Sequence, residues 1–192
     1  MKKIIINIGR QFGSGGKNTA EILGQKLGVT VYDTELITEA AKKSGFSKDF
    51  LTTSDEDTNF FKLGFNNSFI SNNSFFQIQS DAIRNIAEQG SAIFVGRASD
   101  YILRDMDCLD VFITSPLEVR AKRISERRSI SIEAAEALIA KKDRRREAFY
   151  NYVTFGNWGM ASNYDLCIDS SILGIEGTAD FIIDFAKKKG MI

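Results

Sequence analysis

The chain has 192 residues, enough for one compact domain with a hydrophobic core, and we expect a single domain over residues 1–192. Its 25 basic and 25 acidic residues give a formal net charge of zero, which argues against a broad nucleic-acid-binding surface. No apolar run is long enough to span a membrane, and the basic start is too short for a signal peptide, so we expect a cytoplasmic protein without a membrane or nucleic-acid partner.

The residue types that are missing or sparse narrow the chemistry further. The sequence contains no histidine, which removes Ser-His and Cys-His nucleophile pairs and histidine-based zinc sites. Cys108 and Cys167 are too far apart for a paired metal-binding spacing, and we expect both to be buried reduced thiols. Carboxylates, lysines, arginines, hydroxyls and backbone amides remain, and this inventory suits phosphoryl transfer assisted by magnesium.

A glycine-rich turn follows the first apolar run, residues 4–8, and precedes a helical pattern over residues 19–27. Its glycines leave backbone N–H groups open to a polyphosphate, and Lys17 adds a positive charge. The predicted phosphate-binding residues are Gly13, Ser14, Gly15, Gly16, Lys17, Asn18 and Thr19. A tight turn that binds nothing is the alternative.

This turn matches the phosphate-loop pattern G-x-x-x-x-G-K-[ST] imperfectly. Gln11 stands at the first glycine, and Asn18 stands at the hydroxyl position. Thr19, one residue later, is the nearest hydroxyl that could reach a magnesium ion.

Asp33 directly follows the second apolar run, residues 29–32, and therefore lies at the end of a predicted strand near the glycine-rich turn. A carboxylate there could hold magnesium through water, bind a substrate hydroxyl or accept a proton. Capping of the helix predicted over residues 35–41 is the alternative.

Residues 44–76 interrupt the alternation of strands and helices, with six phenylalanines among asparagines and serines and no clean period. One hypothesis is a mobile lid with aromatic contacts to an acceptor. The other is a patch that packs against the body or against a second subunit, which allows a homodimer. The phenylalanines are Phe60, Phe61, Phe65, Phe69, Phe75 and Phe76.

Gly96 and Arg97 follow the third apolar run, residues 92–95, in the same way as Asp33 follows the second. Gly96 allows a sharp turn, and Arg97 would point its planar guanidinium across the crevice, where a phosphate accepts two hydrogen bonds. An ordinary salt bridge is the competing interpretation.

Two helices are predicted after the fourth apolar run, residues 109–114. Ser115, followed by Pro116, is expected to cap the first, which runs to about residue 128. Ser131 begins the second, with Ile132, Ala135, Leu138 and Ile139 on its apolar side.

The second of these helices carries the charged run 141–146. A helix cannot turn six consecutive residues toward one ligand, so most of these charges must be solvated or paired. One or two of the arginines would close over a transferring phosphoryl group.

The last strand is expected over residues 166–168 and the last helix over residues 176–189. Five short strands, each expected to be buried on both faces, alternate with helices along the chain. They predict an α/β fold with a parallel sheet, helices on both faces and a ligand site at the carboxyl ends of the strands.

With these elements in this order, the chain resembles the cytidylate kinase-like family of P-loop nucleoside monophosphate kinases over nearly its whole length. In cytidylate kinases the phosphate loop is G-S-G-K-G-[ST]. An Asp-Thr pair follows the second strand, and a Gly-Arg-Asp sequence follows the third strand. Residues 13–19, Asp33-Thr34 and Gly96-Arg97-Ala98 stand in the matching places. The stretches 10–16, 96–103 and 158–167 look more like a divergent branch of the family without an assigned substrate.

The resemblance implies a three-layer P-loop NTPase fold with a five-stranded parallel sheet. It also implies transfer of the ATP γ-phosphoryl group to a nucleoside monophosphate such as CMP, with magnesium bridging the phosphates. Lys17 and the amides of residues 13–19 would hold the donor phosphates, and Thr19 the metal. Asp33 and Arg97 would face the acceptor.

The same resemblance assigns a lid to residues 129–160, with Arg144 and Arg146 as its catalytic arginines. Three departures from the family pattern keep other functions open. An extra residue precedes Lys17 relative to G-S-G-K, and Val95 and Ala98 replace acidic residues. A catalytically impaired nucleotide-binding sensor or assembly protein, and a kinase for a non-nucleotide small molecule, therefore remain alternatives.

Overall fold

The computed structural model of the chain describes residues 3–43 and 69–192, and gives only the backbone at residues 41–43 and 69–75. Its centre is a parallel sheet of five strands in the order β2-β3-β1-β4-β5. The strands are β1 (Ile5–Arg10), β2 (Thr30–Tyr32), β3 (Ala92–Val95), β4 (Leu109–Thr114) and β5 (Leu166–Asp169). All five apolar runs therefore form strands, within two residues of the predicted bounds.

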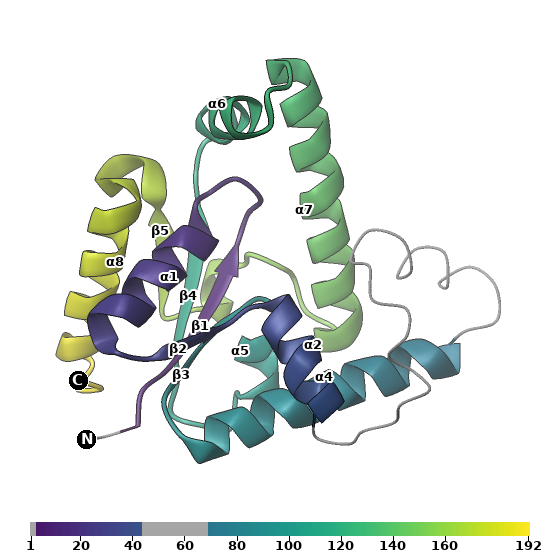
Figure 1. Ribbon diagram of the computed structural model, residues 1–192, viewed down its shortest axis with the longest axis vertical. Helices are drawn as coiled ribbons and strands as arrows, with labels where there is room; N and C mark the ends of the chain where they lie inside the picture. Colours follow the sequence, from purple (N-terminus) through teal and green to yellow (C-terminus); the bar gives the residue numbers. More distant parts are fainter. Residues whose placement is uncertain (1–2, 44–68) are drawn as a thin grey trace.

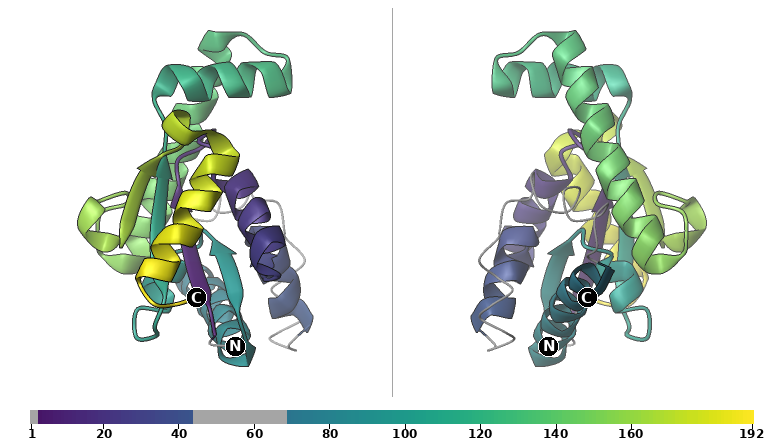
Figure 2. Two further views of the ribbon diagram at one scale, coloured as in Figure 1. Left: turned by 90° about the vertical axis from the view of Figure 1, so that its left-hand side faces the viewer. Right: turned by 90° about the vertical axis from the view of Figure 1, so that its right-hand side faces the viewer.

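Helices cover both faces of the sheet (Figures 1 and 2). On one face lie α1 (Gly16–Leu27) and α8 (Ser170–Lys188). The other face carries α2 (Thr34–Lys43), α4 (Phe69–Gln89) and the short α5 (Ser99–Ile102). Beyond the carboxyl ends of the strands, α6 (Leu117–Arg128) packs against α7 (Ile132–Thr154), and a 3-10 turn (Ala161–Asn163) precedes β5. The predicted three-layer α/β architecture is confirmed.

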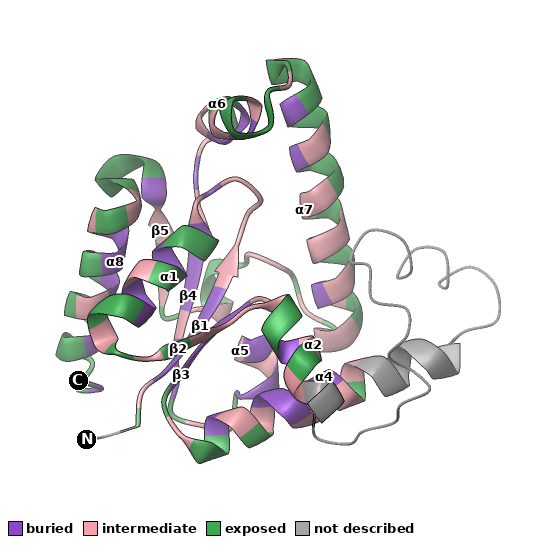
Figure 3. Cartoon of the chain, in the orientation of Figure 1, coloured by how far each residue is buried: buried purple, intermediate pink, exposed green. Residues whose placement is uncertain are grey.

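Burial is greatest in the three central strands, as Figure 3 shows. The edge strands β2 and β5 are only partly covered, so the expectation that all five strands are buried on both faces is wrong for these two. Cys108 is buried, but Cys167 on β5 is exposed, which corrects the prediction of two buried thiols. Within the described ranges, no helix has both the length and the apolar composition needed to cross a bilayer.

Helix ends follow local backbone chemistry in most cases. α1 begins three residues before the predicted start, because Gly15 takes a left-handed conformation with φ 83° and ends the turn. The predicted stop at Gly28 is confirmed, with φ 65°. Ser131 caps α7 as predicted, its Oγ accepting from the N–H of Ala134, although Ile132 on this helix is 42% exposed.

The predicted cap of α6 is wrong. Pro116 occupies the capping position, and the Ser115 hydroxyl makes no capping bond. The backbone of Ser115 is held elsewhere: its N–H donates to Gln11 Oε1 at 3.3 Å, and its carbonyl accepts from Arg120 Nε at 2.9 Å. These bonds leave Ser115 outside the helix that it was expected to begin.

Most of the phenylalanine-rich segment, residues 44–68, lies outside the described residues, so both hypotheses for it stay predictions. Its last residues begin α4, a helix that the sequence pattern did not indicate. Phe76 is the one of the six phenylalanines whose side chain is described. It packs against the cluster around Phe94 and lies edge-on to Phe149, with the ring centroids 6.0 Å apart.

The strand register brings three connecting loops together at one edge of the sheet. Ile8 pairs with Val95, and Tyr32 pairs with Phe94. The N–H of Gly96 still bonds to the carbonyl of Ile8 at 3.0 Å, so the loop after β3 leaves beside the end of β1. The residues that follow β1, β2 and β3 are therefore neighbours, as the parallel arrangement predicts.

Two carboxylates, Asp110 on β4 and Asp165 just before β5, lie away from this edge. Burial raises the pKa of Asp110 to about 6, and the nearby charges of Asp100 and Asp165 contribute to the increase. Asn7 Nδ2 opposes it by donating to Asp110 Oδ1 at 2.8 Å. At neutral pH the folded protein therefore keeps an unfavourable buried charge at this position.

We predict that Asp110→Asn stabilises the protein at pH 7 and removes part of its pH dependence. The pKa of Asp110 is about 6 in the folded protein, against an ordinary value of 3.8. The folded state thus binds this proton more tightly, and stability falls as the pH rises from about 4 to about 6. Urea unfolding across this range should show the wild type losing on the order of 2 kcal/mol relative to the variant. A difference that stays constant with pH, or one that the exposed-site control Glu88→Gln reproduces, contradicts the prediction.

Candidate active site

The chain leaves β1 at Arg10 and reaches α1 through a loop that is bonded to the end of the neighbouring strand β4. Gly13 and Gly15 both have φ 83°, which side chains with a Cβ rarely adopt. Gln11, at the place of the first glycine of the phosphate-loop pattern, uses its side chain to fasten the loop: Oε1 accepts from the Thr114 hydroxyl at the end of β4. This non-glycine residue therefore ties the loop to the neighbouring strand.

Two further side chains fix the loop from the opposite direction. Ser170 at the start of α8 donates from its hydroxyl to the carbonyl of Ser14 at 2.5 Å. Arg123 on α6 donates from Nη1 to the carbonyl of Gly13 at 2.6 Å. With its carbonyls engaged from outside, the loop keeps one backbone conformation.

Asp143 on α7 holds the beginning of the loop and a buried arginine together. Its Oδ1 accepts from the N–H of Phe12 at 2.6 Å, and its Oδ2 accepts from Arg120 Nη1 at 2.7 Å. Arg120, only 7% exposed, also donates from Nη1 to the carbonyl of Phe12 at 3.1 Å. The charges of Arg120 and Asp143 are therefore paired with each other, and for Asp143 this agrees with the expectation that most charges of the run 141–146 are solvated or paired.

A first cavity of about 200 Å³, the loop cavity, opens over the glycine-rich turn. Its charged lining is predominantly basic, with five cations and two carboxylates: Arg10, Lys17, Arg123, Arg127, Arg146, Asp33 and Glu35. The amides at the start of α1 and the positive end of the helix dipole face the same space. The surroundings suit a polyanion.

Asp33 and Lys17 are paired within the loop cavity. Lys17 Nζ lies 2.7 Å from Asp33 Oδ2, and the Lys17 side chain is 58% exposed. Burial acts to raise the pKa of Asp33, but the bond from Lys17 and the N–H groups of Leu36 and Glu35 outweigh it, so the pKa lies below its usual value. The N–H groups of Glu35 and Leu36 both donate to Asp33 Oδ1 and so cap α2. The capping interpretation of Asp33 is therefore correct, and it does not exclude a functional role for the other oxygen.

Asn18 and Thr19, the two residues after Lys17, have different positions. Asn18 is exposed and lines the loop cavity. Thr19 is fully buried and absent from that lining, and in the described part of the chain its Oγ1 has no hydrogen-bond partner. The structure therefore brings Asn18, and not Thr19, to the place where phosphates would lie.

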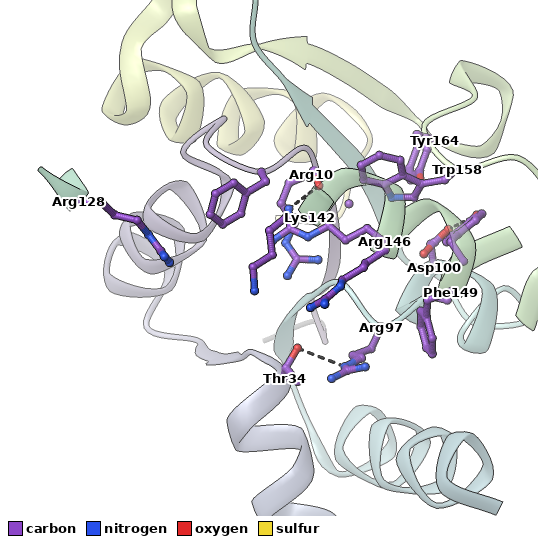
Figure 4. A pocket seen from close by; sticks show the side chains of 16 residues that line it. Arg10, Thr34, Arg97, Asp100, Arg128, Lys142, Arg146, Phe149, Trp158 and Tyr164 are labelled. Carbon is purple, nitrogen blue, oxygen red and sulfur yellow. Dashed lines mark hydrogen bonds between the residues drawn. The ribbon is translucent and has the colours of Figure 1, made fainter. Parts of the chain in front are cut away.

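A second cavity of about 260 Å³, the aromatic cavity, continues from the first (Figure 4). Its lining contains six basic side chains, Arg10, Arg97, Arg128, Lys142, Arg145 and Arg146, and one acidic side chain, Asp100. Aromatic walls come from Phe12, Phe149, Tyr150, Trp158 and Tyr164. An anionic ligand with a flat apolar part matches this combination.

Arg97 enters the aromatic cavity from a strained turn. Arg97 and Ala98 both have left-handed backbones, with φ 59° and 53°. Arg97 Nε donates to Thr34 Oγ1 at 3.3 Å, and its guanidinium carbon lies 5.5 Å from the centroid of the Phe149 ring. The turn thus directs the guanidinium into the crevice, as predicted from its place after β3.

Asp100 lies at the far side of the aromatic cavity, in contact with a tyrosine. Its Oδ2 accepts from the Tyr150 hydroxyl at 2.7 Å, and burial raises the pKa of the carboxyl above its usual value. Burial also raises the pKa of Tyr150 and of Tyr164, and the charge of Asp100 adds to both shifts. The two tyrosines therefore keep their protons, and the Tyr150 hydroxyl holds the Asp100 carboxyl at this end of the cavity.

Four residues line both cavities: Arg10, Phe12, Thr34 and Arg146. Arg146 donates from Nη1 to the carbonyl of Arg10 at 3.0 Å, and its guanidinium lies 5.5 Å from the centroid of the Phe12 ring. Of the two predicted catalytic arginines, Arg146 thus stands where the cavities meet. Arg144 is exposed and belongs to neither lining.

Several lining residues had no predicted role. Arg10 and Trp158 stand in the stretches that resemble the divergent branch, but nothing in their spacing indicates a cavity. Phe149 and Tyr150 lie three and four residues after the charged run on α7, and a helical pattern alone does not show which neighbour they meet. Their function depends on how α7 crosses the sheet edge, which the tertiary structure decides.

A glycine-rich turn between β1 and α1, ringed by cations at the carboxyl edge of a parallel sheet, defines a phosphate-loop protein of the kinase type. The chain belongs to the cytidylate kinase-like family, whose sequence model matches residues 5–172.

Similar proteins support this placement. The cytidylate kinase of Sulfolobus acidocaldarius is 28% identical over 181 residues, which cover 93% of this chain and 92% of that protein. An uncharacterized protein from Eubacterium ventriosum has a crystal structure with a TM-score of 0.79 and 30% identity, covering 97% of this chain and 99% of the other.

Shikimate kinase from Bacteroides thetaiotaomicron matches with a TM-score of 0.59 and 12% identity, covering 96% and 98% of the two chains. At this identity the likeness shows the fold alone. The predicted P-loop fold with a five-stranded parallel sheet is confirmed.

We predict that Asp143→Ala destabilises the protein by about 3 kcal/mol, because Arg120 keeps a buried charge without its partner. The N–H of Phe12 loses its acceptor at the same time. Denaturant unfolding measures the loss. The double variant Arg120→Met with Asp143→Leu should lose less, since neither charge remains. A single variant as stable as the wild type contradicts the role of this bridge.

Proposed function

We propose that the protein transfers the γ-phosphoryl group of ATP to a nucleoside monophosphate, with CMP as the first candidate. The observation that carries this proposal is the pair of adjoining cavities, which share a basic boundary above the glycine-rich loop. One holds the donor and the other the acceptor, so the phosphoryl group crosses only a short distance between them.

The donor phosphates bind in the loop cavity. Gly13 and residues 15–18 of the turn line this space, and Lys17, Arg123 and Arg127 add positive charge around it. Lys17 serves as a phosphate ligand while it stays in contact with Asp33. Asn18, the residue after Lys17, also lines the loop cavity, and its side chain contacts the same donor phosphates.

Magnesium would bind in this cavity together with the donor phosphates, whose oxygens would supply most of its non-water ligands. Among the described residues, no cluster of three or more acidic or cysteine side chains could hold a metal by itself. Magnesium typically takes one or two carboxylates, with phosphate oxygens and water as its other ligands, and Asp33 supplies such a carboxylate. When bound, the ion neutralises charge on the β- and γ-phosphates. The predicted ligand Thr19 is too deeply buried for us to keep it in this role.

The acceptor binds in the aromatic cavity. Arg97 and the basic residues of α6 and α7 suit its phosphate, whereas the rings of Phe149 and Trp158 suit a flat base. Asp100, held by Tyr150, is available to accept a hydrogen bond from an exocyclic amino group. The region 129–160 forms the predicted lid, with Arg146 as the residue that contacts the phosphoryl group in transit; Arg144 stays a prediction.

The state of Asp33 favours a phosphate acceptor over a hydroxyl acceptor. A hydroxyl must lose a proton when it attacks, and the carboxylate nearest the donor site would have to accept it. Asp33 is a poor base, because Lys17 and two N–H groups occupy it and lower its pKa. A monophosphate is already ionised at neutral pH and needs no base.

The test is phosphoryl transfer to a panel of CMP, dCMP, UMP, AMP, GMP and shikimate, with ADP release as the measurement. Calorimetry with Mg-ATP accompanies it. We expect turnover with nucleoside monophosphates and the highest kcat/KM with CMP. Turnover with shikimate and with none of the nucleotides would contradict a nucleotide acceptor and favour an acceptor that reacts through a hydroxyl. Tight Mg-ATP binding without turnover on any acceptor would favour a nucleotide sensor.

We predict that Arg97→Ala weakens acceptor binding much more than ATP binding. Loss of a charge-assisted bond to the acceptor phosphate should raise KM for the acceptor about 10- to 100-fold. The Kd of Mg-ATP should change less than about twofold, because Arg97 lines only the aromatic cavity. Equal losses of affinity for the acceptor and for Mg-ATP would contradict the assignment of Arg97 to the acceptor site.

A further inference from the structure

We propose that Phe12 is a positioning residue for phosphoryl transfer: its ring holds Arg146 at the boundary of the two cavities, where that arginine meets the group in transit. The proposal deepens the proposed function and rests on it for the transfer step. Its effect on donor binding can be measured without knowledge of the acceptor.

Phe12 lies in the loop between β1 and α1, and its backbone is bonded to two helices. Its N–H donates to Asp143 Oδ1 on α7 at 2.6 Å. Its carbonyl accepts from Arg120 Nη1 on α6 at 3.1 Å. Because both backbone groups are engaged, the half-buried side chain starts from a fixed point.

The ring of Phe12 contacts a cation from each of the same two helices. The guanidinium carbon of Arg146 on α7 lies 5.5 Å from the ring centroid, and that of Arg128 on α6 lies 5.9 Å from it. Arg146 stands three residues after Asp143, on the same face of α7. Arg128 stands eight residues after Arg120, on the same face of α6. Phe12 is thus joined to each helix twice, once through its backbone and once through its ring.

Of the two arginines, Arg146 is the one that the ring can direct toward the transferring group. Arg146 is half-buried and lines both cavities, as Phe12 does (Figure 4). Arg128 is exposed and lines only the aromatic cavity. A cation is attracted more strongly to an aromatic ring where water is excluded, so the contact with Arg146 is the stronger of the two.

An aromatic ring directs an arginine without neutralising its charge. A carboxylate in the same place would cancel much of the positive field that a phosphoryl group requires, and it would occupy N–H donors of the guanidinium. Arg146 also donates from Nη1 to the carbonyl of Arg10 at 3.0 Å, which fixes a second point of the group. Ring and carbonyl together restrict the guanidinium to one orientation while it keeps its full positive charge.

Packing alone is the competing explanation for Phe12. The ring borders a small apolar cluster made of Ala121, Ile124, Ala135 and Ile139. A leucine could also pack against this cluster, but it has no π-system to attract a guanidinium. Replacement of the ring by an aliphatic side chain therefore separates the two explanations.

The transfer step requires charge and direction from Arg146, and no proton moves. The bond between the γ-phosphorus and its bridging oxygen breaks, and ADP leaves with that electron pair. An oxygen of the acceptor phosphate forms the new bond. Charge on the transferring oxygens is stabilised best by an arginine that is already oriented, because no ordering then has to accompany the reaction.

Phe12→Leu and Phe12→Tyr test the proposal. We expect Phe12→Leu to lower kcat about tenfold and to weaken Mg-ATP binding about fivefold, because Arg146 loses its orientation. The KM for CMP should change less than about twofold, since Arg97 and Phe149 at the acceptor site contact each other. Phe12→Tyr keeps the ring and should stay within about twofold of the wild type in all three values.

A double-mutant cycle with Arg146→Met shows whether Phe12 acts through the arginine. Arg146→Met alone should lower kcat about 1,000-fold. In that background, Phe12→Leu should cost less than about twofold in kcat and in affinity for Mg-ATP, because no guanidinium remains to be directed.

Two controls accompany the cycle. Tyr101→Leu removes a contact of the same kind outside both cavities, since Arg104 lies 4.2 Å from the Tyr101 ring centroid, and should leave kcat and Mg-ATP binding unchanged. Leu138→Ala removes packing against the same apolar cluster, and should lower the melting temperature without changing kcat.

Wild-type kcat and Mg-ATP binding in Phe12→Leu would overturn the proposal. Equal losses in Phe12→Leu and Phe12→Tyr, or additive losses in the cycle, would overturn it as well. If no acceptor in the panel reacts, the proposed function fails, and the cycle on the Kd of Mg-ATP still decides for or against Phe12. Melting temperatures identify an unfolded variant, and Phe12→Met, a second ring-free side chain of similar volume, then replaces Phe12→Leu.

Discussion

The carboxylate of Asp143 is the interaction on which the arrangement of the site depends. It joins α7 to the loop through Phe12 and to α6 through Arg120. A buried pair of charges is costly unless further hydrogen bonds support it, and Arg120 also donates to the carbonyls of Phe12 and Ser115. The position of α7 in turn sets where Arg146 and Phe149 stand, and both residues line the aromatic cavity.

Asp33 combines a structural role with the functional role that we propose for it. One of its oxygens caps α2 through two N–H groups, and the other meets Lys17. Capping fixes the rotamer, so the second oxygen points into the loop cavity without further support. The same contacts make the carboxylate a weak base, which is why we favour an acceptor that brings its own negative charge.

Runs of Val, Ile and Phe were sufficient to locate the strands, because each run is the length of a strand and ends at a polar residue or glycine. The parallel arrangement then placed Asp33 and Arg97 beside the loop. The sequence could not show that Arg120 is buried, since composition makes it one of many surface arginines. The contact of the Phe12 ring with Arg146 was equally hidden, because it depends on how α7 packs over the loop. Such contacts are tertiary, and no local pattern records them.

The neutral net charge of the chain conceals an uneven distribution. The aromatic cavity collects six cations and one carboxylate, whereas Asp110 on β4 and Asp165 just before β5 lie outside its lining. A low-dielectric crevice lined by one sign of charge concentrates its field on a ligand, while the opposite charges elsewhere cancel the total. A zero formal charge therefore speaks against a broad anionic partner such as a nucleic acid, but it is fully compatible with a small polyanion that enters the crevice.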